Sequence, residues 1–297
     1  MISEKTYALL ALHVYEADPE ENNKPILPTG WKELNDQPTG TNGFAYGVYQ
    51  GPDGEIVISF RGTDDLLSGD MLTNLGLSLS QERQAAAVYA RVLRDHGQDA
   101  QGSNISFTGH SLGGGLAGTM SVWFNRPAVV FDPAPTELGA RSWLNVSYVI
   151  AALDEPVPQA IRDYRANLDA SFTARESNVT SYFAPGSVIY SGNFAFNTIT
   201  GVGQGNPVQF GIANMGGIGG RVDMHSQALL TSGLLSTTFP AATVAVETAL
   251  PLIMNKSLYA LPTKGAERNF LLDLIRSEQG PGDKLTHFGL YDVLSGT

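Results

Sequence analysis

The sequence predicts an α/β fold in which helices cover both faces of a mixed, mostly parallel sheet. Apolar strand-like runs alternate with helix-like segments between residues 43 and 183. One of these runs, AVVF at 128–131, is apolar throughout, as is typical of a strand buried on both faces. The 297 residues suit one large α/β unit. Because neither a repeat nor a clean linker divides the chain, we expect a single domain over 1–297.

The first elements are a helix and a pair of strands. Residues 3–17 read as an amphipathic helix that Ser3 can cap. Residues 18–42 carry four prolines with several Asn and Gly, which favours a loop. Two strands joined by a turn follow: residues 43–50 (GFAYGVYQ), 51–54 (GPDG) and 55–60 (EIVISF).

The rest of the chain alternates helices with strands before it becomes helical. The predicted helices are 80–93, which Ser80 caps and Gly97 ends, 112–124, and a helical block over 135–178 interrupted by Pro156 and Pro158. The predicted strands are 104–108, 128–131 and 179–183, with 187–190 continuing or pairing with the last. Residues 191–222 read as loop or hairpin, and the part from 226 to 297 as mainly helical.

The composition excludes several classes of function. The net charge of −11 repels phosphates over the whole surface, which argues against a nucleic-acid partner. The absence of cysteine excludes disulfides, thiol nucleophiles and cysteine-ligated metal centres. No apolar run reaches the ~18 residues that a membrane-spanning helix needs. The N-terminus is not a convincing signal peptide, because Tyr15 and Glu16 end a short apolar stretch with helical character.

The strongest motif is Gly109-His110-Ser111-Leu112-Gly113, which matches G-x-S-x-G between a predicted strand and a predicted helix. In such an elbow, the serine hydroxyl is lifted clear of the sheet by a strained turn. The two glycines leave room where the strand and the helix approach each other. The helix N-terminus favours a developing oxyanion. We therefore predict that Ser111 is a nucleophile rather than an ordinary helix cap.

A second segment, FRGTDD at 60–65, gives this elbow its context. Together with GHSLGG at 109–114, it resembles the class 3 lipase family of α/β-hydrolases. The resemblance implies that the backbone N–H groups of Thr63 and Leu112 form an oxyanion hole, and that Arg61 ties the loop down. Three looser matches look like the lipase or phospholipase A1-like domains of proteins with repeats-in-toxin tails: VVFDPAP (129–135), MHSQALL (224–230) and LPLIMNKSLYAL (250–261).

A serine nucleophile needs a base, and the chain has five histidines. We expect His13 to be packed or on the surface, His96 to complement a helix dipole, and His110 to support the elbow indirectly. His225 remains the favoured base, because it follows the nucleophile and the Gly-rich region and opens a helix. His287, in the terminal segment, is the alternative.

The sequence leaves open which residue is the acid of a catalytic triad. Ser187 stands where relatives carry a carboxylate, and no Asp or Glu lies between Glu176 and Asp223. We favour Asp132, which ends the strand after the elbow helix, although a buried Asp can also pin the following turn. The alternatives are Asp154 (if 146–153 were a strand), Asp223, and a Ser–His dyad without any carboxylate.

These residues predict a serine hydrolase that cleaves lipid esters, either glycerophospholipids at the A1 position or acylglycerols, at a membrane or micelle surface. No metal or cofactor is required. Residues 66–79 and the block 135–178 are candidate lids. We expect export without an N-terminal signal peptide, with a cytoplasmic location as the alternative. A hydrolase-fold binding module without turnover and an acyltransferase that uses the same serine are the competing functions.

Overall fold

The computed structural model describes residues 1–15, 27–34, 43–62, 79–183, 207–209 and 227–235. Within these ranges, seven strands form one sheet whose spatial order follows the chain. The strands are β1 (Lys32–Glu33), β2 (Tyr46–Gln50), β3 (Ile56–Phe60), β4 (Ile105–His110), β5 (Ala128–Phe131), β6 (Val179–Phe183) and β7 (Pro207–Gln209). β2 pairs antiparallel with both β1 and β3, and β3 to β7 are parallel. The predicted mixed, mostly parallel sheet is confirmed.

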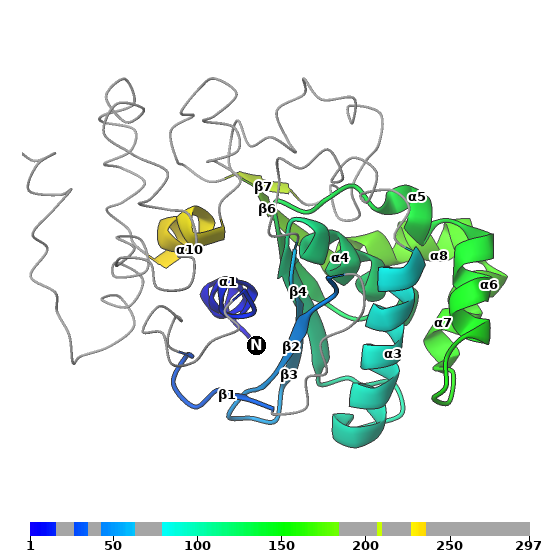
Figure 1. Cartoon of the computed structure of the whole chain (residues 1–297), viewed down its shortest axis with the longest axis horizontal. Coiled ribbons are helices and arrows are strands. Elements are labelled where there is room, and N and C mark those ends of the chain that lie inside the picture. Colours follow the sequence, from blue (N-terminus) through cyan, green and yellow to red (C-terminus); the bar gives the residue numbers. More distant parts are fainter. Residues whose placement is uncertain (16–26, 35–42, 63–78, 184–206, 210–226, 236–297) are drawn as a thin grey trace, which may run out of the picture.

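The helices lie on both faces of this sheet (Figure 1). One face carries α3 (Leu79–His96), α4 (Leu112–Phe124) and the group of α5 (Glu137–Ala140), α6 (Trp143–Ala151), α7 (Gln159–Ala166) and α8 (Leu168–Arg175), followed by the short turn η1 (Glu176–Asn178). The other face carries α1 (Glu4–His13), which packs on β4 and β5 and contacts α10 (Gln227–Leu235). None of the helices in the described ranges is long and apolar enough to span a membrane.

Alternating side chains on the central strands explain these two layers. Phe107 of β4 joins the hydrophobic core that the sheet shares with α3 and α4. Its neighbour Ser106 points the other way, where its Oγ accepts a 2.9 Å hydrogen bond from the Tyr7 hydroxyl of α1. Similarly, the Ser59 hydroxyl of β3 donates to the Leu10 carbonyl of α1 at 3.1 Å. The period-two pattern therefore places an apolar layer under α3 and α4 and a hydrogen-bonded layer under α1.

The block 135–178 forms the crossover between β5 and β6 and packs into the core. Ile161 and Tyr164 are fully buried. The Tyr164 hydroxyl and the Trp123 indole N–H both donate to the Ala140 carbonyl, at 2.9 and 3.0 Å. These contacts join α4, α5 and α7, so they fix this part of the block to the core.

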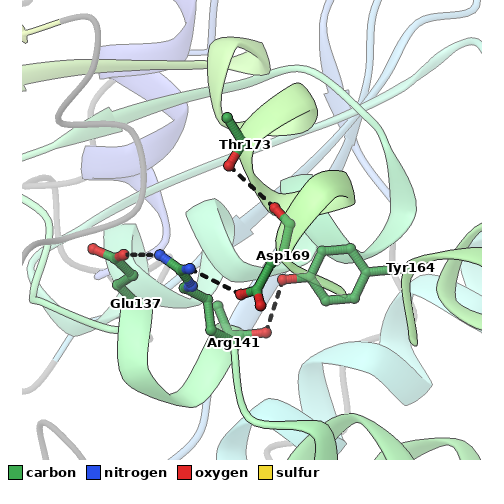
Figure 2. Close-up of polar contacts among 6 residues, drawn as sticks. Glu137, Arg141, Tyr164, Asp169 and Thr173 are labelled. Atoms are coloured by element: carbon green, nitrogen blue, oxygen red, sulfur yellow. Dashed lines mark hydrogen bonds and ion pairs between the residues drawn. The ribbon is translucent and has the colours of Figure 1, made fainter. Parts of the chain in front are cut away.

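Arg141, immediately after α5, ties the start of this crossover to α8 (Figure 2). Its two terminal nitrogens contact Glu137 at 3.0 Å and Asp169 at 2.8 Å. The Asp169 carbonyl in turn accepts a 3.1 Å bond from the Thr173 hydroxyl one turn later. Since these groups are largely exposed, they orient the helices more than they stabilise the fold.

Two strands lie where the sequence predicts only loop or hairpin. The strand β1 falls in the segment 18–42, and β7 falls in the segment 191–222. β7 pairs in parallel with β6, so it is not the second arm of a hairpin with that strand. Ser80 lies inside the first turn of α3 instead of capping it. The candidate lid at 66–79 (apart from Leu79), the strand-like 187–190 and most of the helical part 226–297 lie outside the described residues.

Candidate active site

Ser111 occupies the turn between β4 and α4, as the elbow motif predicts. Its backbone has φ 56° and ψ −126°, a strained conformation for a residue with a side chain. Three hydrogen bonds fix it: its N–H donates to the Phe131 carbonyl, and its carbonyl accepts from Gly115 and Ala134 at 3.0 and 2.8 Å. The turn is therefore held from both the neighbouring strand β5 and its own helix.

The two glycines of the motif are required by the backbone around them. A Cβ on Gly109 would lie 2.5 Å from the carbonyl group of Gly113. A Cβ on Gly113 would lie 2.0 Å from the Phe60 carbonyl oxygen of β3. Both distances are far below a van der Waals contact, and backbone atoms cannot move aside as a flexible side chain can. The expectation that strand and helix would collide with side chains at these positions is confirmed.

The environment of Ser111 differs from the sequence expectation in one respect. The strained turn raises the residue at the carboxyl edge of the sheet, but only 2% of its surface is exposed. The neighbouring Leu112 is also nearly covered, at 5%. The predicted nucleophile is therefore covered rather than freely exposed.

The segment after β3 lies directly against this turn. Phe60 is in register with Gly109 in the parallel pair of β3 and β4, so the residues that follow each strand are neighbours. A Cβ on Gly62 would lie 3.1 Å from the Ser111 Cβ and 2.7 Å from the His110 carbonyl oxygen. This brings the start of the predicted oxyanion loop to the predicted nucleophile. Thr63, its predicted donor, is the next residue and lies outside the described residues.

Leu112, the other predicted donor, is the first residue of α4. The first N–H groups of a helix have no carbonyl partner within the helix, and the helix dipole adds partial positive charge there. Gly115 is the first residue of α4 whose N–H closes a helical turn, onto the Ser111 carbonyl. This end of α4 is suited to receive the negative charge of an oxyanion next to Ser111.

Asp132 lies one strand away at the same edge. It follows β5 directly, is 2% exposed, and has a left-handed backbone with φ 39°. Its N–H donates to the Tyr182 carbonyl of β6 at 2.7 Å. Because the residue before it accepts the Ser111 N–H, the backbone places Asp132 next to the serine turn. This is the placement that a triad acid after β5 requires, and its role remains a prediction.

One alternative acid does not meet its condition. Asp154 requires a strand at 146–153, but this segment lies mainly in helix α6, which ends at Ala151. Asp154 is exposed in the bend that follows, beside Glu155, which is paired with Arg94 near the C-terminal end of α3. That end of α3 precedes β4, so Asp154 lies at the edge of the sheet opposite Ser111.

The predicted bases fall outside the described residues. His225 and His287 both do, and so do Asp223 and Ser187. Gln227, two residues after His225, is 3% exposed. Its side-chain amide donates a 3.1 Å hydrogen bond to the Ala8 carbonyl of α1. The segment that carries His225 is thus anchored at its far end to the helix that packs on β4 and β5.

The other three histidines have structural surroundings. His13 is buried, with Nδ1 3.0 Å from the Tyr49 hydroxyl. His96 ends α3 and is exposed, in agreement with its predicted place in the last turn. His110 is buried, and its Nδ1 lies 2.9 Å from the hydroxyl of Tyr15.

Tyr15 is the residue at this site that the sequence does not reveal. Its hydroxyl also accepts the N–H of Gly62 at 3.1 Å. In the sequence, Tyr15 is only one member of an apolar stripe near the end of the first helix. Its contact with His110 spans 95 residues and leaves no local pattern.

Comparison with known proteins places these features in a family. The family described as phospholipase-like, the Tle-like phospholipase domain, matches residues 6–185, which include β2 to β6 and the serine turn. An extracellular phospholipase A1 of Serratia liquefaciens is 29% identical over 171 residues, or 56% of this chain. The aligned part spans about half the length of that relative, 50%. Within the described ranges, no group of three or more His, Asp or Glu side chains is arranged to hold a metal ion.

Proposed function

This chain belongs to the family of Tle-like phospholipase domains, and on that premise we propose that it hydrolyses the carboxylic esters of lipids through an acyl-enzyme on Ser111. The observation that carries the proposal is the strained turn at Ser111, which is placed between Gly62 of the predicted oxyanion loop and the first turn of α4. Strain of this kind is characteristic of functional residues that the surrounding structure holds in place.

In the first half of the reaction, the Ser111 hydroxyl attacks the ester carbonyl carbon while His225 takes the hydroxyl proton. The N–H groups of Thr63 and Leu112 stabilise the oxyanion of the tetrahedral intermediate. The intermediate collapses with cleavage of the bond to the leaving alcohol, which receives the proton from His225. In the second half, His225 takes a proton from water, which attacks the acyl-enzyme and frees the fatty acid while Ser111 regains its proton.

Asp132 is the proposed third member of the triad. A buried carboxylate next to the serine turn would orient the His225 imidazole and stabilise its protonated form. The favoured substrate is a glycerophospholipid cleaved at the A1 position, because the relative from Serratia liquefaciens carries that activity in its name. Acylglycerols are the second substrate class. The same relative is named as extracellular, which supports export of this chain.

The test uses Ser111→Ala with two readouts. The wild-type protein is expected to release fatty acid and lysophospholipid from phosphatidylcholine in mixed micelles, and a fluorophosphonate probe should label it at a single serine. The variant should keep the wild-type melting temperature and lose both reactions. Fatty-acid release by the variant would overturn the acyl-enzyme.

The products separate the competing functions. A binding module without turnover predicts that the wild-type protein is neither labelled nor active. An acyltransferase predicts that the acyl group appears on an added alcohol faster than on water. The position of the acyl chain that remains on the lysophospholipid identifies A1 cleavage.

A further inference from the structure

The hydroxyl of Tyr15 joins the two segments that border the nucleophile. It accepts the N–H of Gly62 at 3.1 Å on the oxyanion loop, and it lies 2.9 Å from Nδ1 of His110, the residue before Ser111. The two rings also contact each other, with centroids 5.9 Å apart. A phenolic hydroxyl has one proton and two lone pairs, so a single group can satisfy both partners.

Gly62 is enclosed at this junction. A Cβ on Gly62 would lie 2.4 Å from the Tyr15 hydroxyl oxygen on one side and 2.7 Å from the His110 carbonyl oxygen on the other. Glycine has the most backbone freedom of any residue, and here contacts on both sides restrict it. Gly62 is therefore the described residue through which the predicted oxyanion loop is held against the elbow.

We propose that Tyr15 is a positioning residue for the oxyanion hole: its hydroxyl holds Gly62, at the start of the predicted oxyanion loop, against the elbow. This inference rests on the proposed function. Tyr15 touches neither the ester nor the nucleophile, and it acts through the loop and through His110. An oxyanion donor is effective only when it is fixed in place before the charge develops.

Tyr15 follows the C-cap of α1, and this helix is well suited to serve as its fixed support. Its residues Tyr7 and Leu10 are hydrogen-bonded to β4 and β3. Its Ala8 carbonyl accepts bonds from Gln227 and Thr231 of α10, at 3.1 and 3.3 Å. One helix thus links the oxyanion loop to the segment that follows the proposed base.

The first test compares Tyr15→Phe with Tyr7→Phe. Both variants lose one tyrosine hydroxyl and keep the ring, but the hydroxyl of Tyr7, within α1, contacts Ser106 in the body of β4. For Tyr15→Phe we expect kcat to fall about 10- to 100-fold with KM unchanged, below the full loss of an oxyanion donor. Labelling by a fluorophosphonate should fall in parallel, because phosphonylation uses the same hole. Tyr7→Phe should retain the wild-type rates.

The second test reads the contact itself. The sequence contains a single Arg–Gly pair, Arg61-Gly62, so labelling with ¹³C-carbonyl arginine and ¹⁵N glycine isolates one amide signal, that of Gly62. This amide should exchange slowly with solvent in the wild-type protein and in Tyr7→Phe, and quickly in Tyr15→Phe. The wild-type measurement stands even where a variant does not fold.

The outcomes distinguish this inference from the proposed function. Loss of an oxyanion donor lowers the rate by much more than about twofold. If the wild-type protein is labelled and the labelling rate of Tyr15→Phe is within that range of it, the positioning role is wrong. Rapid exchange of Gly62 in the wild-type protein also overturns it. If the wild-type protein is not labelled at Ser111, the acyl-enzyme fails instead, whatever the Gly62 signal shows.

Discussion

Gly113 and Phe60 meet backbone to backbone: a Cβ on Gly113 would lie 2.0 Å from the Phe60 carbonyl oxygen. Gly113→Ala should therefore push α4 away from β3, with a loss of about 2–4 kcal/mol of stability and of nearly all esterase activity. Gly114→Ala is the milder comparison in the same helix turn, because its Cβ would lie 3.0 Å from the Gly109 carbonyl oxygen, a tight contact that a small shift can relieve. Thermal unfolding and hydrolysis of a short p-nitrophenyl ester measure both. Equal behaviour of the two variants would contradict this reading of the elbow.

Asp132→Asn tests the proposed acid. Asparagine has the size of aspartate and tolerates the left-handed backbone at φ 39°, so the turn should survive. The substitution replaces a carboxylate, which only accepts hydrogen bonds, by an amide, and this would misorient the base. We therefore expect kcat to fall by about 10³- to 10⁴-fold with little change in KM. Asp154→Asn, at the opposite edge of the sheet, should retain full activity. If Asp132→Asn keeps its activity, Asp132 is not the acid, and a Ser–His dyad or Asp223 remains as the alternative.

The burial of Ser111 predicts that its reactivity depends on a lipid surface. With 2% of the residue exposed, a fluorophosphonate should label it slowly in aqueous buffer. Micelles of an uncharged detergent should speed the labelling if an apolar surface uncovers the serine. The comparison uses one probe concentration below and above the critical micelle concentration. A constant rate across that point would show that the serine is uncovered without help from a surface.

The buried carboxyl of Glu82 predicts that stability depends on pH. Glu82 of α3 is 5% exposed, and burial raises its pKa from 4.5 to about 7. Its Oε2 accepts a 2.9 Å bond from the Asn145 amide of α6. Between pH 4.5 and 7, the unfolded chain releases this proton before the folded one does, so stability should fall as pH rises and stay low above 7.

Glu82→Gln should remove this dependence, since glutamine resembles the protonated acid at every pH. The variant should match the wild-type protein near pH 4 and exceed it at pH 8 by up to roughly 3 kcal/mol. Denaturant unfolding at both pH values measures the gap. A gap of the same size at each pH would mean that Glu82 ionises normally in the folded state.

Local patterns predicted the elements that determine the site. The helix 112–124 and the strands 128–131 and 179–183 have the predicted bounds, because apolar runs end at sharp turn signals on both sides. The elbow could be predicted from five residues, since its two glycines are required by the close backbone contacts that such a turn makes. Ser111 is nevertheless buried, and the burial of a residue depends on distant segments that no local motif describes.

Elements held by distant partners could not be predicted in this way. Strand β7 has three residues and begins with Pro207, so its own sequence gives no strand signal, and its pairing with β6 makes it one. The role of Tyr15 depends on two partners, Gly62 and His110, that lie 47 and 95 residues away. Such contacts are visible only when the sheet has brought the segments together.

The chain-ordered sheet also determines when the molecule becomes complete during synthesis. The ribosome delivers the strands in the order in which they pair, so the serine turn can form while the later half is still unmade. The contact between Gln227 and Ala8, which are 219 residues apart, can form only after α10 has been made. A nascent chain therefore carries the serine turn before His225, the proposed base, has been synthesised.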